Sequence, residues 1–339
     1  MPAEPAVPPA PLREPFHIID PESFHRTFLD EICALATDVR AVAKSREGRL
    51  GLQALLSDRR AMLYFTQPST RTFLSFDNAC HILGIRTSEI RDPSTSSEVK
   101  GESLEDSIRT FSSYVDIIIM RSAEPGLAAR AARLMDSIAR RLPIVNAGSG
   151  PDQHPTQALL DIYTLDRSFA ERGGIEGKTI GMMGDLARGR TVRSLCHLLR
   201  HYPGVRLRFL SPPEFRMRAD VKETLSRHAI EFDETDEPAT ALPGLDALYL
   251  TRLQSEYDRP GENARFDHAR FGIGPDELAR MNPDAIIMHP LPRGPELDPR
   301  VDDDPRAMYW RQERNGMWVR AALLIRVLGA EAQLRELGR

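Results

Sequence analysis

Short runs of apolar and β-branched residues alternate along this chain with longer segments whose apolar positions recur at helical spacing. That alternation is typical of parallel β-sheets with α-helices on their faces, so the sequence predicts an α/β protein. We expect two doubly wound parallel-sheet domains with a site in the cleft between them. Strands are predicted at residues 61–66, 85–90, 116–121, 143–147, 178–184, 205–210, 246–251 and 285–290.

The length of 339 residues and a hydrophobic content of 41% favour two packed domains over one. A helical run from His154 to about Leu165 leads into a polar, glycine-containing segment at 166–177 that suits a hinge. The predicted division is a flexible proline-rich tail at 1–14, a first domain at 15–165, a second domain at 166–315 and a last apolar helix within 316–339. The sequence leaves open against which domain that helix packs.

Composition excludes several classes of protein. A formal net charge of -4 gives no overall positive surface for nucleic acid. The sequence contains no run of about 18 apolar residues, so no membrane-spanning helix is predicted. The opening residues lack the apolar core of a signal peptide. Cys33, Cys80 and Cys196 are too scattered for a disulfide framework or a four-cysteine zinc site. We therefore expect a cytoplasmic protein.

The unusual polar segments of the chain all follow predicted strands. In open parallel sheets, ligands bind beyond the carboxyl ends of the strands, because the loops there lead into helix N-termini. The one-sided placement of these segments therefore predicts a shared cleft. They are QPSTRT at 67–72, Arg121, NAGSGPDQHPTQ at 146–157, GDLARGR at 184–190, TRLQ at 251–254 and HPLPR at 289–293.

The first of these segments has the composition of an anion site. Ser69, Thr70, Arg71 and Thr72 stand where a strand ends and a helix begins. Free backbone N–H groups, three hydroxyls and one guanidinium at a helix start suit a phosphate, assisted by the helix dipole. The alternative is an ordinary N-cap, a common role for serine and threonine.

The HPTQ segment places His154 and Gln157 on one face of the opening turn of a helix, so both can address one ligand. In a water-poor site near arginines the histidine stays neutral and can donate a hydrogen bond to a carbonyl oxygen. Alternatively, the histidine only donates to a backbone group.

Gly181, Gly184 and Gly189, of which the last two stand in GDLARGR, have the spacing G-x2-G-x4-G, which differs from a dinucleotide-binding loop. Arg190 and Arg252 are better placed as two planar clamps for a dicarboxylate, although structural salt bridges are the alternative. The HPLPR turn could present backbone carbonyls to an amide or ammonium, or could be only a stiff connection. Lys100 could belong to a lid or simply face solvent.

The order of these motifs, namely STRT, KGES, MR, HPTQ, GDLxxGRT, TRxQ and HPLPR, resembles the carbamoyltransferase family over about residues 15–330. The HPLP form resembles its aspartate branch, since the ornithine branch usually has a cysteine before the Leu-Pro. The resemblance implies transfer of a carbamoyl group from carbamoyl phosphate to the amine of L-aspartate, without metal or cofactor. It also implies that the last helix returns to the first domain.

By this resemblance, the residues that bind carbamoyl phosphate are Ser69, Thr70, Arg71, Thr72, Arg121, His154, Gln157, Leu291 and Pro292. Those implied to take part in catalysis are Arg71, Thr72, Arg121 and His154. Negative charge then grows on the carbonyl oxygen and on the departing phosphate, where fixed donors stabilise it.

The residues implied to bind L-aspartate are Lys100, Arg190, Arg252 and Gln254. In this family the loop with the equivalents of Ser96 and Lys100 enters a neighbouring subunit, so we expect a homotrimer or an assembly of trimers. A regulatory chain or a dihydroorotase could be a further partner.

Two positions depart from the family pattern: Gln67 replaces a frequent glutamate, and Phe73 replaces a frequent arginine. Since a neutral Gln67 makes weaker contacts than a charged pair, we expect domain closure to rely on other contacts. An ornithine-type acceptor is a second interpretation, against which the paired arginines argue. A non-catalytic scaffold is a third, because fold alone does not exclude it.

Overall fold

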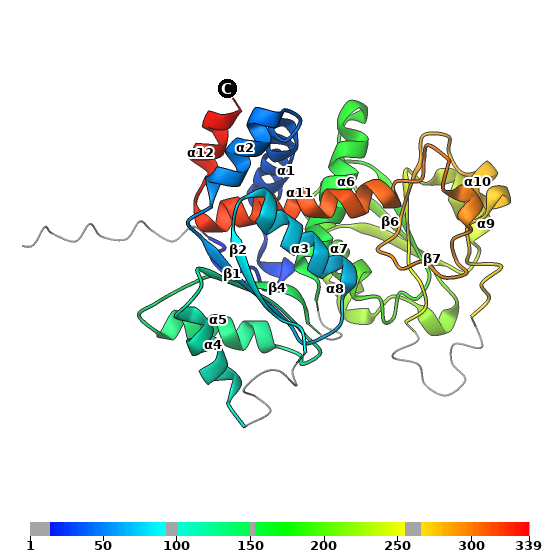
Figure 1. Ribbon diagram of the computed structural model, residues 1–339. Coiled ribbons are helices and arrows are strands. Elements are labelled where there is room, and N and C mark those ends of the chain that lie inside the picture. The colour runs from blue at the N-terminus through cyan, green and yellow to red at the C-terminus, as the bar shows by residue number, and fades with distance from the viewer. Residues whose placement is uncertain (1–13, 93–100, 150–152, 255–265, 339) are drawn as a thin grey trace, which may run out of the picture.

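The computed structural model describes residues 14–92, 101–149, 153–254 and 266–338, and contains two parallel sheets flanked by helices (Figure 1). The first sheet has the order β2-β1-β3-β4, with β1 (Arg60–Phe65), β2 (Arg86–Ile90), β3 (Ile117–Ser122) and β4 (Ile144–Ser149). The second has the order β7-β6-β5-β8-β9, with β5 (Thr179–Met183), β6 (Arg206–Leu210), β7 (Glu231–Thr235), β8 (Ala247–Leu250) and β9 (Ile286–Met288). Every strand pair is parallel, so the predicted fold class is confirmed.

The helices before, between and after these strands are α1 (Arg26–Val42), α2 (Arg46–Leu55), α3 (Thr70–Ile82), α4 (Leu104–Ser112), α5 (Leu127–Ser137), α6 (Pro155–Phe169), α7 (Arg190–Leu199), α8 (Ala219–Arg227), α9 (Pro238–Ala241), α10 (Pro275–Arg280), α11 (Tyr309–Leu328) and α12 (Glu331–Leu337). None of the helices in the described ranges is long and apolar enough to cross a membrane.

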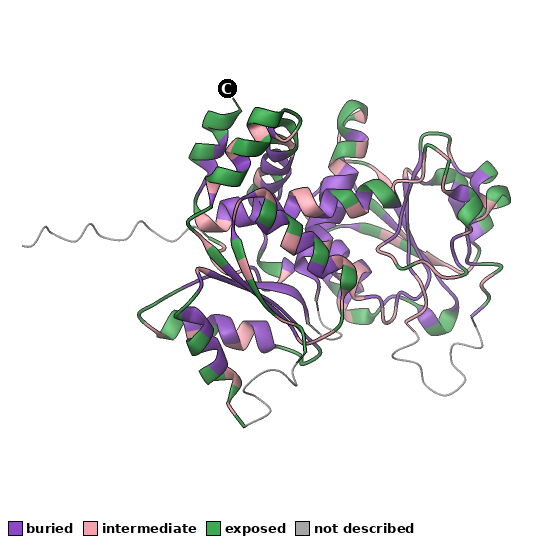
Figure 2. Ribbon diagram, in the orientation of Figure 1, coloured by how far each residue is buried: buried purple, intermediate pink, exposed green. Residues whose placement is uncertain are grey.

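Both faces of the first sheet are covered, as the buried strands in Figure 2 show. Because side chains alternate along a strand, Ala61, Leu63 and Phe65 join one core while Met62 and Tyr64 join another. The first core includes residues of α1, α3, α6 and α11 and continues to the second sheet. The second core is closed by α4 and α5. Helices α6 and α11 thus connect the two sheets through one continuous apolar core.

Eight predicted strands are present, with ends within two residues of the predicted limits, but β7 was missed. Its sequence, EFDET, contains one apolar residue, Phe232, and the strand is partly exposed at the edge of the second sheet. An edge strand with little buried surface lacks the apolar pattern from which the others were predicted.

The prediction of one last helix at 316–339 is wrong in two respects: the helix begins earlier, and a second helix follows it. Helix α11 begins at Tyr309, and Gly316 lies inside it, where an added Cβ would meet the Arg320 guanidinium at 2.7 Å and Leu160 at 3.0 Å. This glycine therefore permits close packing and does not interrupt the helix. Gly329, with a φ of +75°, ends α11 before α12. Helix α11 packs against α1, α3 and α6.

The predicted hinge at 166–177 is partly helical. Helix α6 extends to Phe169, and a 3₁₀ turn follows at Ala170–Arg172. The fully buried Phe169 extends the apolar face of α6 beyond the point at which the sequence becomes polar. The connection that remains without helix is therefore shorter than expected.

Candidate active site

The carboxyl ends of both sheets border a cavity of about 390 Å³. Its wall includes every described residue that the sequence analysis placed in the site: Ser69, Thr70, Arg71, Thr72, Arg121, His154, Gln157, Arg190, Arg252, Gln254, Leu291 and Pro292. Ser96 and Lys100 lie outside the described residues. Tertiary structure thus brings together groups that are as far apart in the chain as Ser69 and Pro292.

The donor wall, which we define as the start of α3, is organised around Ser69. This residue stands at the N-cap, where its backbone oxygen accepts from the Phe73 N–H at 3.3 Å. Its side chain makes no capping hydrogen bond, so the interpretation of the segment as an ordinary N-cap is wrong for the hydroxyl. Phe73 packs edge-on against Phe65, with 5.4 Å between ring centroids, and holds the first turn on β1. The wall therefore combines a helix start with a Ser69 hydroxyl that does not cap the helix.

Arg121 and His154 lie side by side in the depth of the cavity. The Arg121 Nη1 donates to the Ala147 carbonyl at 3.2 Å and lies 3.5 Å from the His154 Nε2. Gly148, with a φ of +121°, allows this approach, because a Cβ there would lie 2.6 Å from the Arg121 Nη1.

The environment of His154 keeps its ring neutral, as expected from the sequence. Burial, followed by the positive charges of Arg190, Arg121 and Arg320, lowers the pKa of His154 well below its ordinary value. Its Nδ1 is buried without a hydrogen-bond partner among the described residues. The alternative in which this ring donates to a backbone group is therefore not what the described structure contains.

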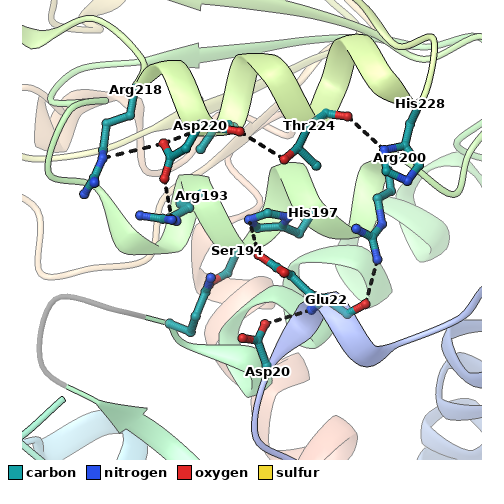
Figure 3. Close-up of polar contacts among 12 residues, drawn as sticks. Asp20, Glu22, Arg193, Ser194, His197, Arg200, Arg218, Asp220, Thr224 and His228 are labelled. Carbon is teal, nitrogen blue, oxygen red and sulfur yellow. Dashed lines mark hydrogen bonds and ion pairs between the residues drawn. The ribbon is translucent and has the colours of Figure 1, made fainter. Parts of the chain in front are cut away.

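Helix α7, which begins at Arg190, is anchored at its far end by the N-terminal segment (Figure 3). The Glu22 carboxylate lies 3.3 Å from the His197 Nε2, and the Glu22 carbonyl accepts from the Arg200 guanidinium at 2.7 Å. Nearer its start, Ser194 accepts from the His154 N–H at 3.1 Å. One helix thus positions Arg190 and contacts the backbone of His154.

Asp185 joins two loops of the acceptor wall, which we define as the loops after β5 and β8 together with Arg190. Its fully buried carboxylate accepts from the Arg188 Nε at 2.7 Å and from the Gln254 N–H at 3.1 Å. Burial raises the pKa of Asp185, and these contacts oppose that rise. The Arg252 guanidinium donates to the Leu253 carbonyl at 2.8 Å. Asp185 and Arg188 were missed, although both stand within the GDLARGR motif.

The HPLPR turn is fixed by a buried histidine. The Leu291 N–H donates to the His289 Nδ1 at 2.8 Å, so the Nε2 carries the ring proton and donates to Glu296 at 2.9 Å. Leu291 has a φ of +52°, and the bond from Leu291 to Pro292 is cis. A hydrogen-bond network therefore sets the shape of the turn.

Arg320 is a cavity residue that sequence analysis did not find. It lies in the apolar run of α11, is only 3% exposed, donates to the Ser75 hydroxyl at 2.6 Å and stacks 5.0 Å from the Phe76 ring centroid. Burial lowers the pKa of Arg320 to about 10. An arginine within a largely apolar helical run was the available signal, and Arg326 shares that feature.

The described cavity wall is strongly basic although the whole chain is slightly acidic. Among the described lining residues the carboxylate is Glu313, and the arginines are Arg71, Arg121, Arg188, Arg190, Arg252 and Arg320. Among the described residues, no cluster of three or more histidine, cysteine or acidic side chains is arranged for a metal ion. Fold and site together define a two-domain α/β protein whose interdomain cavity has the charge to attract small anions.

Family comparison makes this class specific. Residues 17–167 match the model described as aspartate/ornithine carbamoyltransferase, carbamoyl-P binding domain. Residues 176–327 match the model described as aspartate/ornithine carbamoyltransferase, Asp/Orn binding domain. The chain belongs to the aspartate/ornithine carbamoyltransferase family, as its motifs led us to expect.

Similar proteins include aspartate carbamoyltransferase 1, chloroplastic, of Pisum sativum, which is 42% identical over 91% of this chain and 77% of that protein. The aspartate carbamoyltransferase catalytic subunit of Methanopyrus kandleri is 40% identical over 92% and 97%. Among solved structures, the catalytic subunit of M. jannaschii aspartate transcarbamoylase has a TM-score of 0.82 at 36% identity, covering 92% of this chain and 98% of that one. The Trypanosoma cruzi enzyme in complex with carbamoyl phosphate and aspartate has a TM-score of 0.79 at 34% identity, covering 91% and 94%.

Proposed function

We propose that this chain transfers the carbamoyl group of carbamoyl phosphate to the α-amine of L-aspartate, forming N-carbamoyl-L-aspartate and phosphate for pyrimidine biosynthesis. The observation that carries the proposal is one cavity whose lining includes both an α3 start suited to phosphate and the arginines of the acceptor wall. The two ligands named for the Trypanosoma cruzi relative match these two walls in charge.

The donor phosphate binds at the start of α3. Backbone N–H groups and the hydroxyls of Ser69, Thr70 and Thr72 donate to its oxygens, while Arg71 and Arg121 balance its charge. The amide of Gln157 and the carbonyls of Leu291 and Pro292 hold the carbamoyl NH2. Support comes from the common position of these groups on the cavity wall.

The reaction depends on fixed hydrogen-bond donors. The neutral His154 donates to the carbonyl oxygen together with Thr72 and Arg121, and these donors stabilise the charge that develops as the amine attacks. The phosphate itself accepts the amine proton as it leaves. Since three guanidiniums disfavour the imidazolium, the ring does not compete with the substrate for charge.

Arg190, Arg252 and Gln254 bind the carboxylates of L-aspartate. An ornithine-type acceptor would bring a further cation to a wall that already contains Arg188, Arg190 and Arg252. Placing a cation there is unfavourable without a facing carboxylate, so the aspartate branch is favoured.

The active form is a homotrimer or an assembly of trimers, in which Ser96 and Lys100 of one subunit serve the cavity of the next. Mixing Arg71→Ala and Lys100→Ala subunits tests this arrangement. We expect each variant alone to be nearly inactive and the mixed oligomers to recover part of the activity. If mixtures remain inactive while light scattering shows mixed trimers, Lys100 does not act across subunits.

A cytoplasmic location remains a prediction, because the plant relatives are named chloroplastic. Further association with a regulatory chain or a dihydroorotase is equally a proposal. Size-exclusion chromatography of the native protein from its source cells, after cell fractionation, tests both.

The central experiment measures phosphate release from carbamoyl phosphate with L-aspartate or L-ornithine as the acceptor. We expect release with L-aspartate alone, loss in Arg71→Ala, and no change in a control variant, Arg300→Ala, at an exposed position. Release with L-ornithine alone would assign the chain to the other branch. No release with either acceptor, from a folded oligomer, would support a non-catalytic scaffold.

A further inference from the structure

Asp161 is a buried carboxylate one helical turn beyond Gln157 in α6. Its side chain is fully buried, and it is absent from the described wall of the cavity. Its Oδ1 accepts from the Gln157 Nε2 at 2.9 Å and from the Gln312 Nε2 at 2.7 Å, and its Oδ2 accepts from the Tyr249 hydroxyl at 2.9 Å. The carboxylate therefore joins α6, α11 and β8 of the second sheet.

Burial of this carboxylate costs folding free energy. Burial raises the pKa of Asp161 to about 7, even though the hydrogen bonds from Gln312, Tyr249 and Gln157 favour the carboxylate. A carboxylate buried among neutral donors contributes little net stability compared with well-packed apolar side chains. A role beyond stability would explain a carboxylate at this position.

The first consequence concerns the orientation of the Gln157 amide. Above its pKa of about 7 the carboxylate is ionised and only accepts hydrogen bonds, so it selects the NH2 end of a neighbouring amide and repels the oxygen end. With its Nε2 bound to Asp161, Gln157 retains its Oε1 as the group available to the cavity that it lines. An amide turned by 180° would present NH2 to the donor NH2, and neither group could accept.

The second consequence concerns the HPLPR turn. Gln312 donates to Asp161 through its Nε2, and its Oε1 accepts from the His289 N–H at 2.8 Å. The same carboxylate therefore orients a second amide, which holds the backbone at the start of the turn. The two groups proposed to accept from the carbamoyl NH2, Gln157 and the HPLPR carbonyls, share Asp161 as their common support.

We propose that Asp161 is a positioning residue that orients Gln157 and Gln312 and so makes the site select donors carrying an NH2 group over other acyl phosphates. This inference rests on the proposed role of Gln157. Acetyl phosphate is a suitable probe, because a methyl group replaces the NH2 while the phosphate and carbonyl remain. The selectivity ratio is the inhibition constant of acetyl phosphate divided by the KM of carbamoyl phosphate.

The test replaces Asp161 by leucine in the full-length oligomer. Asp161→Leu keeps the approximate size of the side chain but removes both acceptor oxygens, so neither glutamine amide is oriented by this position. We expect the selectivity ratio to fall about ten-fold, the effect of losing one well-oriented hydrogen bond. Inhibition by inorganic phosphate, which has no NH2, should change less than about two-fold.

The matched control is Thr164→Val. Thr164 is also buried in α6 and accepts from the Asn315 Nδ2 of α11 at 3.0 Å, but it forms a hydrogen bond with neither Gln157 nor Gln312 in the described structure. We expect Thr164→Val to lower the melting temperature without changing the selectivity ratio. A fall of the ratio in the control as well would attribute the effect to loss of packing and overturn the proposal.

Gln157→Ala separates the inference from the role on which it rests. An unchanged ratio in Asp161→Leu, with a lowered ratio in Gln157→Ala, overturns the positioning role of Asp161 alone. An unchanged ratio in both variants means that Gln157 does not hold the NH2. If Asp161→Leu fails to fold, Gln312→Met supplies the test: a lowered ratio supports the shared network, and an unchanged ratio overturns it.

Discussion

The donor wall and the acceptor wall of the cavity are built in different ways. The donor wall is a contiguous tetrapeptide, Ser69 to Thr72, at the start of one helix. The acceptor wall brings together Arg190 and Arg252 from separate loops, and the buried Asp185 joins these loops through Arg188 and Gln254. A local helix start needs few other residues to bind an anion, whereas separated guanidiniums need a buried carboxylate to hold their loops together.

The largest expected effect is on the donor wall. Arg71→Ala removes a cation at the phosphate and should lower kcat by about 100- to 1000-fold, as for the loss of one transition-state donor. Steady-state kinetics with both substrates varied measures the change. An effect on the KM of L-aspartate alone would mean that Arg71 belongs functionally to the acceptor wall.

Asp185→Asn should weaken the acceptor wall and leave the donor wall intact. The variant retains the size of the side chain but loses the charge that holds Arg188. We expect the KM of L-aspartate to rise about ten- to thirty-fold, which corresponds to loss of one charge-assisted hydrogen bond. The KM of carbamoyl phosphate serves as the internal control, and an equal rise in both constants would contradict a division into two walls.

Acid should loosen the anchor of α7 at its far end. Burial, and then Arg200, lower the pKa of His197 from 6.5 to about 4. Between pH 4 and 6.5 the unfolded chain binds a proton at His197 that the folded chain does not. The neutral ring therefore stabilises the fold fully above about pH 6.5, and this contribution to the free energy of unfolding is lost as pH falls toward 4. The expected contribution is about 1–3 kcal/mol.

Thermal unfolding from pH 4 to 8 measures this contribution. In His197→Gln the part of the pH dependence that comes from this ring should disappear, while Asp20, Arg193 and Asp220 around it remain. If the melting temperature depends on pH in the same way in the variant and the wild type, His197 does not contribute to the acid sensitivity of the fold.

The smallest expected effect is that of a substitution at Gln67. Gln67 lines the cavity, and its Oε1 is buried without a hydrogen-bond partner among the described residues. A carboxylate there could pair with the arginines, so Gln67→Glu should change the apparent L-aspartate affinity or turnover by about two- to five-fold. If neither constant changes, this position takes no part in domain closure.

The two walls also differ in how far they could be predicted. The four residues of the donor wall adjoin one another, and their hydroxyls and helix start were evident from the sequence. Arg190 and Arg252 were found because each follows a strand. Asp185, Glu296 and Arg320 were missed, because their importance depends on which distant groups they contact. The hydroxyl, guanidinium and amide groups of the site could be predicted from the sequence, whereas the residues that position them could not.

The sequence by itself determined the α/β class, the strands with apolar cores, the family and the residues at strand ends, since all of these follow from local pattern and adjacent residues. Tertiary structure decided what depends on distant contacts. Sheet pairing added the polar edge strand β7, close packing against Leu160 placed Gly316 inside α11, and burial beside three guanidiniums kept His154 neutral. Helix α6 itself places Gln157 beside Asp161, but only the packing of α6, β8 and α11 brought Tyr249 and Gln312 there, because hydrogen bonds between distant residues leave no pattern along the chain.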